Sequence, residues 1–409
     1  MRTYGLIGLG LLAFWPAQAR ALGIRIADQD AEATARGNAF VATADNPSAV
    51  YYNPAGITQL KGLQARLGVY AVAPGAHYRS GAGPESDTKD RWEAAPQLYA
   101  TWTPKEHWLS VGLGMYTPYG LSLKWPEPTG FETLAIKGRI TYITVNPVVA
   151  VQPHPRLSVA AGPTINLSDT ELLQRKAAFL GGNLLEFKGD GTDYGFNAGV
   201  RWQVHERHVL GATYRSATGI RYDGTVTGFL TPFASGANAR LGFPQHVAVG
   251  WSFRPTEKWN LEFNADWTDW DRVDTVTLND RSGASAALPF RWQSSWFYEW
   301  GVTRQLPRGF FVSGGYIFSE NSVPDRGFNP LVPDSDRHVF SLGVGRRAGA
   351  WSWALSYQAA YGPARTVTGS PTPTFTLPGG APVPLSIQTA NGRYDSLSHA
   401  LALSVGYSF

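Results

Sequence analysis

The chain ends on "SHALALSVGYSF" (398–409), which alternates in a way that soluble sheets seldom do. Every second residue is apolar or aromatic, from Leu401 through Leu403, Val405 and Tyr407 to Phe409. The residues between them are alanine, serine or glycine. A half-exposed strand of a soluble sheet turns a polar face to water, and this strand has none. It therefore predicts a sheet with one broad apolar face and one face that is crowded rather than hydrated.

The composition also departs from that of a soluble globular protein. Of 409 residues, 43% are hydrophobic and 13% aromatic, but only 16% are charged. This is few charges for a water-exposed surface. The formal net charge of +4 comes from scattered basic residues, without the clustered stripe that binds nucleic acid. Cysteine is absent, which excludes a disulfide framework and a thiolate metal site.

The first residues are typical of an export signal. Arg2 precedes the apolar run "YGLIGLGLLAFW" (4–15), and "PAQARA" (16–21) offers small-residue cleavage sites after Ala19 or Ala21. The run is about 12 residues long, short of the roughly 20 that a membrane-spanning helix needs. We therefore expect a signal peptide over residues 1–21 and an exported mature chain.

Alternation with a period of two continues beyond residue 62. It is clear in "YGFNAGVRWQV" (194–204), "WNLEFNADW" (259–267) and "WFYEWGV" (296–302). A sandwich and a membrane barrel both produce this pattern, because each has one apolar face. Large aromatic residues stand at strand ends, as in Trp259 and Trp267 or Trp351 and Trp353. Aromatic girdles at both interfaces favour the barrel.

About 14 strands are expected, and the connections between them alternate between short and long. Short connections such as "PHPR", "HER" and "LPR" predict periplasmic turns, and the longer ones predict extracellular loops. The fold class is thus all-β, a transmembrane antiparallel β-barrel over residues 62–409. The expected strands are 63–73, 96–103, 108–117, 137–152, 157–168, 193–204, 208–218, 243–254, 259–267, 292–304, 309–319, 338–346, 351–361 and 396–409.

Residues 22–61 have no sustained alternation and contain Gly37, Pro47, Pro54 and Gly56. A folded segment ahead of a barrel is naturally placed inside the lumen, so residues 22–61 are interpreted as an N-terminal hatch, or plug. The alternative is a loose periplasmic extension.

The stretch "GNAFVATADNPSAVYYNPAGITQL" (37–60) resembles the hatch of the FadL-type outer-membrane transporters of long-chain fatty acids and other hydrophobic compounds. Its centre, Asn53, Pro54 and Ala55, matches the NPA motif of that family. The similarity continues through "TPYGLSLKW" (117–125), "ITVNPVVAV" (143–151), "GDGTDYGFNAGVRW" (189–202) and "YRSATGIRYDGTVT" (214–227). It covers nearly the whole mature chain in the same order.

The resemblance implies a monomeric barrel in the bacterial outer membrane that works by passive diffusion, without a cofactor. It also implies an inward kink in the third strand that opens the wall toward the lipid. Gly112, Gly114 and Pro118 are the residues there that would permit a break in pairing. The alternative for Gly112 and Gly114 is that they are ordinary lumen-facing glycines. The terminal Phe409 resembles the signal that the barrel-assembly machinery recognises.

The resemblance places outer capture of the cargo on extracellular loops. The apolar candidates lie in "AAFLGGNLLEF" and "TGFLTPF", and the cationic candidates for a carboxylate lie after the fifth strand, near Gln174, and at the start of the tenth. Loop packing and solvated loop charges are the alternative interpretations. The candidates are Phe179, Leu180, Leu184, Leu185, Phe229, Leu230, Phe233, Arg175, Lys176 and Arg291.

Without a role for these cations, the cargo would be an aromatic or other neutral hydrocarbon. Two further classes remain open at this point, a general diffusion porin and a lipid-modifying enzyme. The nearest thing to a catalytic group is "DSDRH" (334–338), whose neighbouring residues point to opposite faces of an extended strand and cannot form a triad. No nucleophile elbow or metal-ligand spacing is present, so we expect a transporter and neither an enzyme nor a metalloprotein.

Overall fold

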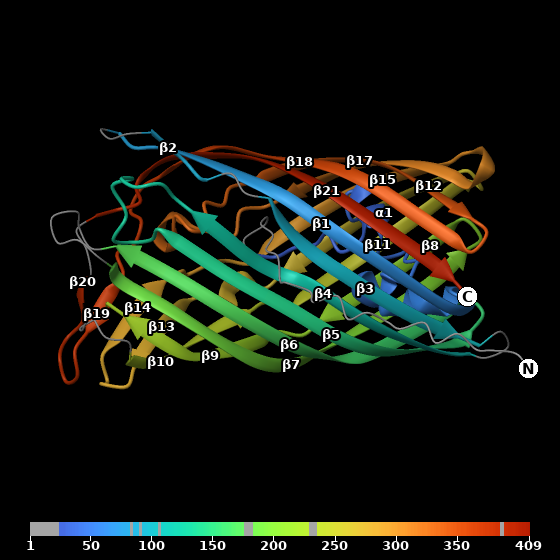
Figure 1. The fold of residues 1–409 in the computed structure, drawn as a ribbon. Coiled ribbons are helices and arrows are strands. Elements are labelled where there is room, and N and C mark those ends of the chain that lie inside the picture. The colour runs from blue at the N-terminus through green and yellow to red at the C-terminus, as the bar shows by residue number, and fades with distance from the viewer. Residues whose placement is uncertain are drawn as a thin grey trace, which may run out of the picture.

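The computed structural model shows a closed β-barrel with a small folded segment inside it (Figure 1). It describes residues 24–81, 85–89, 92–104, 108–175, 183–228, 235–384 and 388–409. The expected signal peptide therefore lies outside the described residues. No helix in the described ranges is long and apolar enough to cross a membrane.

Fourteen of the described strands close the barrel, and each overlaps one strand expected from the sequence. All neighbours are antiparallel, and the last strand pairs with the first over Gln64–Arg79 and Arg393–Ser408. The barrel strands are β1 (Gly62–Arg79), β3 (Glu93–Thr103), β4 (Leu109–Lys124), β5 (Lys137–His154), β6 (Leu157–Arg175), β7 (Asn183–His205), β8 (His208–Arg215), β11 (His246–Thr256), β12 (Trp259–Thr268), β15 (Ser295–Gln305), β16 (Phe310–Ser319), β17 (Arg337–Ala348), β18 (Trp351–Val367) and β21 (Gly392–Ser408).

The two faces of the C-terminal strand are arranged as its alternation predicts. Leu401 and Leu403 are each 45% exposed on the outer surface, whereas Ala402 and Ser404 are buried inside. Leu403 pairs with Val69 of β1 and Leu355 of β18, which are also apolar. The outer surface is thus a continuous apolar band across the closure of the barrel.

Seven shorter strands extend the wall at the end with long connections (left in Figure 1). Among them, β9 continues the wall beyond β8 and pairs with β7 and β10. Three 3-10 segments, η3 (Trp270–Arg272), η4 (Pro307–Gly309) and η5 (Asp325–Gly327), lie in connections. The shorter strands are β2 (Glu85–Asp87), β9 (Thr218–Thr227), β10 (Ser235–Phe243), β13 (Thr275–Asp280), β14 (Ser285–Pro289), β19 (Thr374–Thr376) and β20 (Val383–Pro384).

Several predicted strand boundaries were wrong: strands such as β4 and β7 run well beyond their predicted outer ends, and three other wall strands stop short at one level of the wall. The predicted strand 208–218 stops at Arg215, and those at 243–254 and 292–304 begin only at His246 and Ser295. Pro244 has no N–H for a ladder, and Arg291 has a positive φ of 46°. The wall therefore bends between its membrane part and its outer extension.

The hatch fills the periplasmic half of the lumen, as predicted. It contains α1 (Ala31–Ala35), α2 (Ala49–Tyr52) and η1 (Pro54–Gln59), and nearly all of its residues are buried. Figure 1 shows α1 within the barrel, toward the end where the C-terminus lies. Asp30 begins α1 by accepting a hydrogen bond from the Glu32 N–H, which satisfies a free helix-end donor.

Glycines of the wall make room for the hatch. A Cβ built on Gly301 would lie 2.5 Å from Arg36 O, and one on Gly112 would lie 2.9 Å from the side chain of Val50. A Cβ on Gly315 would overlap the backbone of Arg36 and Gly37. Small lumen-facing residues are therefore required where the hatch backbone touches the barrel.

Candidate lumen pathway

The outer half of the lumen is an apolar chamber. Its core includes aromatic side chains from opposite parts of the wall, such as Tyr119 on β4 and Phe243 on β10, whose ring centroids lie 5.0 Å apart. In the connection that follows β4, Phe131 packs against Tyr78 of β1, and Trp125 packs against Tyr394 of β21. Side chains from the loops thus close the barrel on the extracellular side with apolar groups.

One apolar cavity inside this chamber, as formed by the described residues, is small. An apolar cavity of about 100 Å³ lies between the inner faces of β5, β9, β10 and β13, where Leu241, Leu278 and Tyr222 line it. Typical ligand pockets have roughly 300–1,000 Å³. The structure is therefore a closed state, and a long ligand enters only if side chains move apart.

The wall is incomplete between β3 and β4. Their ladder covers only Leu98–Trp102 of β3 and Val111–Met115 of β4. Beyond it, β3 stays paired with β1 as far as Glu93, while β4 leaves β3 and stays with β5. Residues 93–97 of β3 and the outer half of β4 thus face each other without a ladder. We call this interruption the β3–β4 seam.

A bulge bends β4 at the seam. Tyr116 and Tyr119 pair with Thr144 and Tyr142 of β5, so Thr117 and Pro118 together stand opposite one residue. An extra residue of this kind bends the strand and interrupts its ladder. Pro118 contributes because it cannot donate a ladder hydrogen bond.

The hatch supplies the partners that β4 loses. Ile26 N–H donates to Pro118 O, and Gly120 N–H donates to Ile24 O, each at 2.8 Å. The side chain of Gln29 donates to Thr117 O at 2.8 Å. A free strand edge leaves backbone groups unsatisfied, so this pairing closes the seam from the inside.

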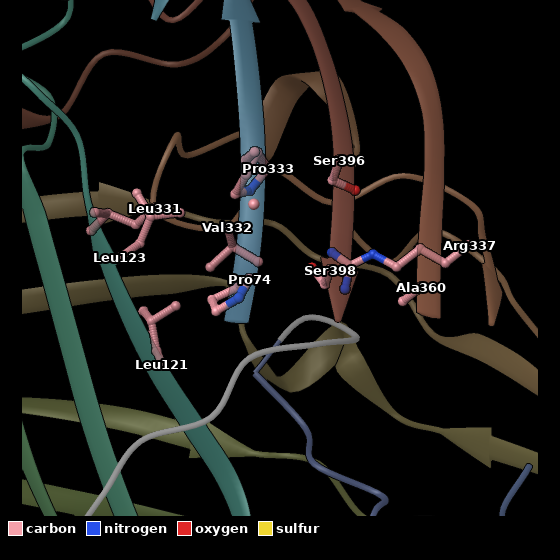
Figure 2. A pocket seen from close by; sticks show the side chains of 12 residues that line it. Pro74, Leu121, Leu123, Leu331, Val332, Pro333, Arg337, Ala360, Ser396 and Ser398 are labelled. Carbon is pink, nitrogen blue, oxygen red and sulfur yellow. The ribbon is translucent and has the colours of Figure 1, made fainter. Parts of the chain in front are cut away.

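The bent part of β4 borders a small pocket near the outer end of the seam. Figure 2 shows Leu121 and Leu123 on β4 near Leu331, with Pro74 of β1 beside them and Ser396 and Ser398 on β21. The segment 331–333, from the connection between β16 and β17, crosses this pocket. The outer end of the seam is thus covered by a loop rather than by a strand.

The hatch motif joins the hatch to the wall. Asn53 is fully buried, and its side-chain amide donates to Val41 O at 2.8 Å and to Val200 O of β7 at 3.0 Å. Its Oδ1 accepts from Ala55 N–H and begins η1, with Pro54 in the first turn. One asparagine therefore fixes a hatch loop, a helix start and a wall strand together.

Buried ion pairs hold the hatch as well. Arg25 binds Asp266 of β12 with two hydrogen bonds of 2.6 and 2.9 Å, and Arg36 lies 3.4 Å from Glu262 of the same strand. Arg66 of β1 pairs with Asp30. Loss of one partner would leave a buried charge, which is strongly destabilising.

The three residues predicted to open the third strand do not act alike. Pro118 lies in the bulge, but Gly112 and Gly114 lie in the intact ladder, opposite Thr101 and Tyr99 of β3. Both glycines face Val50 of the hatch. Their interpretation as a break in pairing was wrong, because the hatch requires their small size and the ladder continues through them.

The candidate ligand-binding residues are only partly placed. Leu185 is buried in the chamber core and Leu184 is half-buried beside it, whereas Arg291 is exposed. Arg175 ends β6, with a side chain outside the described part. Gln174, the position matched to the family's cationic residue, is buried and donates to Leu134 O at 2.8 Å. Lys176, Phe179, Leu180, Phe229, Leu230 and Phe233 lie outside the described residues.

Residues 24–29 fall within the predicted hatch, but sequence reasoning gave no sign that they pair with β4. This segment closes the seam, yet "IRIADQ" has no motif that distinguishes it from an ordinary linker. Only the alternation of Ile24 and Ile26 around Arg25 is a signal, typical of a short strand.

An outer-membrane β-barrel with a hatch in its lumen and an interrupted wall is a transport fold. Residues 12–362 match the family model described as outer membrane protein transport protein (OMPP1/FadL/TodX), so the chain belongs to this family.

Curated relatives agree with this assignment. A putative outer membrane protein of Neisseria meningitidis is 24% identical over 398 residues, covering 81% of this chain and 84% of the relative. A long-chain fatty acid transport protein of Salmonella typhi is 23% identical over 360 residues, covering 74% and 78%.

Solved structures share the fold. A Pseudomonas aeruginosa FadL homologue matches with a TM-score of 0.79 at 19% identity, and the Pseudomonas putida toluene transporter TodX with 0.73 at 16%. Each comparison covers 95% of this chain and all of the other. Its family membership makes this chain an outer-membrane transport protein.

Proposed function

We propose that this protein takes up long-chain fatty acids or similar long-chain molecules by passive diffusion. Extracellular loops capture the molecule, the apolar chamber receives its tail, and the β3–β4 seam releases it sideways into the outer membrane. The observation that carries this proposal is the seam itself, where β3 and β4 separate beyond Leu98 and Met115 and the hatch occupies the inner edge of β4.

The energetics favour lateral release for such a cargo. Burial of one CH₂ contributes about 0.8 kcal/mol, so a chain of some 15 groups gains roughly 12 kcal/mol gross in an apolar chamber. Returning that tail to periplasmic water would lose the same amount. Exit through a wall opening keeps the tail in an apolar medium throughout, and a concentration gradient is then sufficient to drive uptake.

The hatch argues for this route over a water-filled pore. Its residues are buried against the wall on all sides, with ion pairs to β1 and β12 and a hydrogen bond to β7. A polar solute crossing along the barrel axis would have to displace these contacts. A lipid-soluble molecule that leaves at the level of the β4 bulge would have to displace residues 24–29, which pair with β4 there.

Deleting Pro118 tests the lateral route. The deletion leaves Thr117 alone opposite its partner on β5, which removes the bulge and restores regular pairing with β5. Cells that lack their own transporter would express the wild type, the Pro118 deletion, or a control deletion of Gly380, which is exposed in an outer loop. Uptake of labelled oleate and labelled toluene is measured alongside the amount of assembled barrel.

We expect oleate uptake by the wild type and the Gly380 deletion, and its loss in the Pro118 deletion at equal assembly. Unchanged oleate uptake without Pro118 would refute lateral release and leave transport intact. Uptake of toluene but not of oleate would indicate that the substrate is a neutral hydrocarbon. Passage of small sugars with uptake of neither compound would support a porin.

A further inference from the structure

A row of polar side chains crosses the lumen wall between the hatch and the apolar chamber. Arg215 on β8, His246 on β11, Thr268 on β12 and Ser295 on β15 are consecutive cross-strand partners. Each is at most 6% exposed. The row stands at the level where the wall bends, since each residue is the first or last of its strand. We call it the polar row.

The polar row has an apolar side and a hatch side. Trp270 and Trp292, which lie just beyond Thr268 and before Ser295 in the chain, belong to the chamber core and pack together at 5.1 Å. On the other side, Arg25 of the hatch donates to Thr268 Oγ1 at 2.7 Å. A ligand whose tail occupies the chamber would therefore bring its polar end to this row.

Arg215 differs from the other buried arginines of the described residues. Arg25, Arg36 and Arg66 each form an ion pair with a buried carboxylate, whereas Arg215 forms none in the described part of the chain. Its Nη1 donates to the Tyr116 hydroxyl at 2.6 Å.

The guanidinium of Arg215 is also packed between two rings, those of Tyr51 and Tyr116, each with its centroid 5.1 Å away. Aromatic faces attract a cation but neutralise no charge. Arg215 thus keeps a full positive charge in a buried site.

Several polar atoms of this region have no hydrogen-bond partner among the described residues. They include Arg215 Nε, His246 Nδ1 and Ser295 Oγ, together with Arg25 Nε from the hatch. A buried polar group left without a partner is destabilising, and a buried charged group is more so. Guanidinium N–H groups in a fork bind a planar carboxylate well. Arg215 Nε and His246 Nδ1 lie on paired residues of neighbouring strands, and an anionic head group between them would supply a partner for both.

We propose that Arg215, assisted by His246, binds the carboxylate of the long-chain ligand between the chamber and the seam. This inference rests on the proposed function and adds the position of the head group. Tyr116 carries the hydroxyl that Arg215 binds and is the last residue of β4 before the bulge. A carboxylate at the free Nε of Arg215 would therefore lie close to Tyr116 and beside the point where β4 leaves β3.

The test compares a charged and a neutral ligand of equal tail length. Oleate, at a pH where it is ionised, and oleyl alcohol are titrated against the purified full-length protein in an uncharged detergent. The variants are Arg215→Met and Arg215→Lys, with Arg221→Met as a control, since Arg221 is exposed and pairs with Asp223. Heat-modifiable migration in gels verifies that each barrel is folded.

We expect the wild type and Arg221→Met to bind oleate more tightly than oleyl alcohol. Arg215→Met should lose on the order of ten- to a hundredfold in oleate affinity, the loss expected for a hydrogen bond to a charged group, while its affinity for oleyl alcohol stays the same. Arg215→Lys should recover part of the difference, because it keeps the charge without the fork.

The possible failures are separable. Equal binding of both ligands by the wild type, or a preference for oleate that survives Arg215→Met, would overturn the inference and leave hydrophobic transport standing. Equal losses for both ligands in Arg215→Met would assign Arg215 a structural role and also overturn it. Binding of neither ligand by the wild type would refute the proposed function itself.

Discussion

The pair Gly314 and Gly315 on β16 offers a sharp test of the fit between hatch and wall. Gly315 faces the lumen, and a Cβ there would lie 2.7 Å from Arg36 O and closer still to Gly37 N. Gly314 faces lipid, and a Cβ there would first meet Leu342 Cδ2, at 3.6 Å. The substitution Gly315→Ala should therefore displace the hatch, whereas Gly314→Ala should not.

The size of the effect follows from what the new methyl group meets. The atoms facing Gly315 belong to backbone, so no side chain can swing aside, and overpacking of this kind costs about 1–3 kcal/mol. Applied to the equilibrium between a seated and an unseated hatch, this cost changes the ratio about 5- to 150-fold. At Gly314 the methyl group makes ordinary contact, so that position should change little.

Ion conductance across planar bilayers measures the seating of the hatch, because a displaced hatch leaves the lumen open to water. Gly315→Ala should show more frequent open events than the wild type, and Gly314→Ala should match the wild type. Thermal unfolding of both variants verifies that the barrel itself is intact. Equal conductance of the two variants would refute the close contact between residues 36–37 and β16.

Three further predictions concern the lipid face, the hatch motif and an outer loop. Leu403→Arg should lower the free energy of unfolding in vesicles by about 2–4 kcal/mol, the cost of a charge near the midplane, and an unchanged urea midpoint would mean that the inside and outside faces are wrongly assigned. Asn53→Ala should destabilise the seated hatch by about 1–3 kcal/mol, because it leaves buried backbone groups without partners. Ion conductance should then be higher than that of the wild type, and unchanged conductance would contradict this prediction. Partial burial opposes ionisation of Asp325, but hydrogen bonds from Thr368 N–H and Arg365 outweigh it and hold its pKa below the ordinary value. The connection between β16 and β17, which contains Asp325, should therefore be stabilised at pH values above the ordinary aspartate pKa, and this stabilisation should be lost as the pH falls through the lowered pKa. Proteolysis of this connection should rise in acid for the wild type but not for Asp325→Asn.

Much of the fold could be predicted from the sequence, because each strand faces two fixed environments. The side chains of Leu401 and Leu403 need lipid whatever their neighbours are, so alternation alone locates the strand and its outer face. The hatch could be located from its lack of alternation and from its resemblance to a known family. The NPA motif identified Asn53, although not its bond to Val200 on β7.

The ends of several strands could not be predicted in this way. The predicted strands run without a break through residues 216–217 and 292–294, yet β8 ends at Arg215 and β15 begins only at Ser295. The glycines of β4 illustrate the same difficulty. Gly112 and Gly114 were expected to weaken pairing, but their contacts with Val50 explain them, and the interruption falls at Thr117 and Pro118 instead.

What the sequence by itself determined is the barrel, its two faces and its family, since these depend on local periodicity and on contiguous motifs. Only the tertiary structure decided where the wall is interrupted, which hatch residues cover the seam, and that Arg215 is buried without a carboxylate partner in the described chain. The physical reason is distance along the chain. The site of Arg215 brings together three distant segments, those of Arg215, Tyr116 and Tyr51. The pattern within any one segment cannot show which side chains of the other two it will meet. The sequence alone therefore could not show that Arg215 is buried without a carboxylate partner in the described chain.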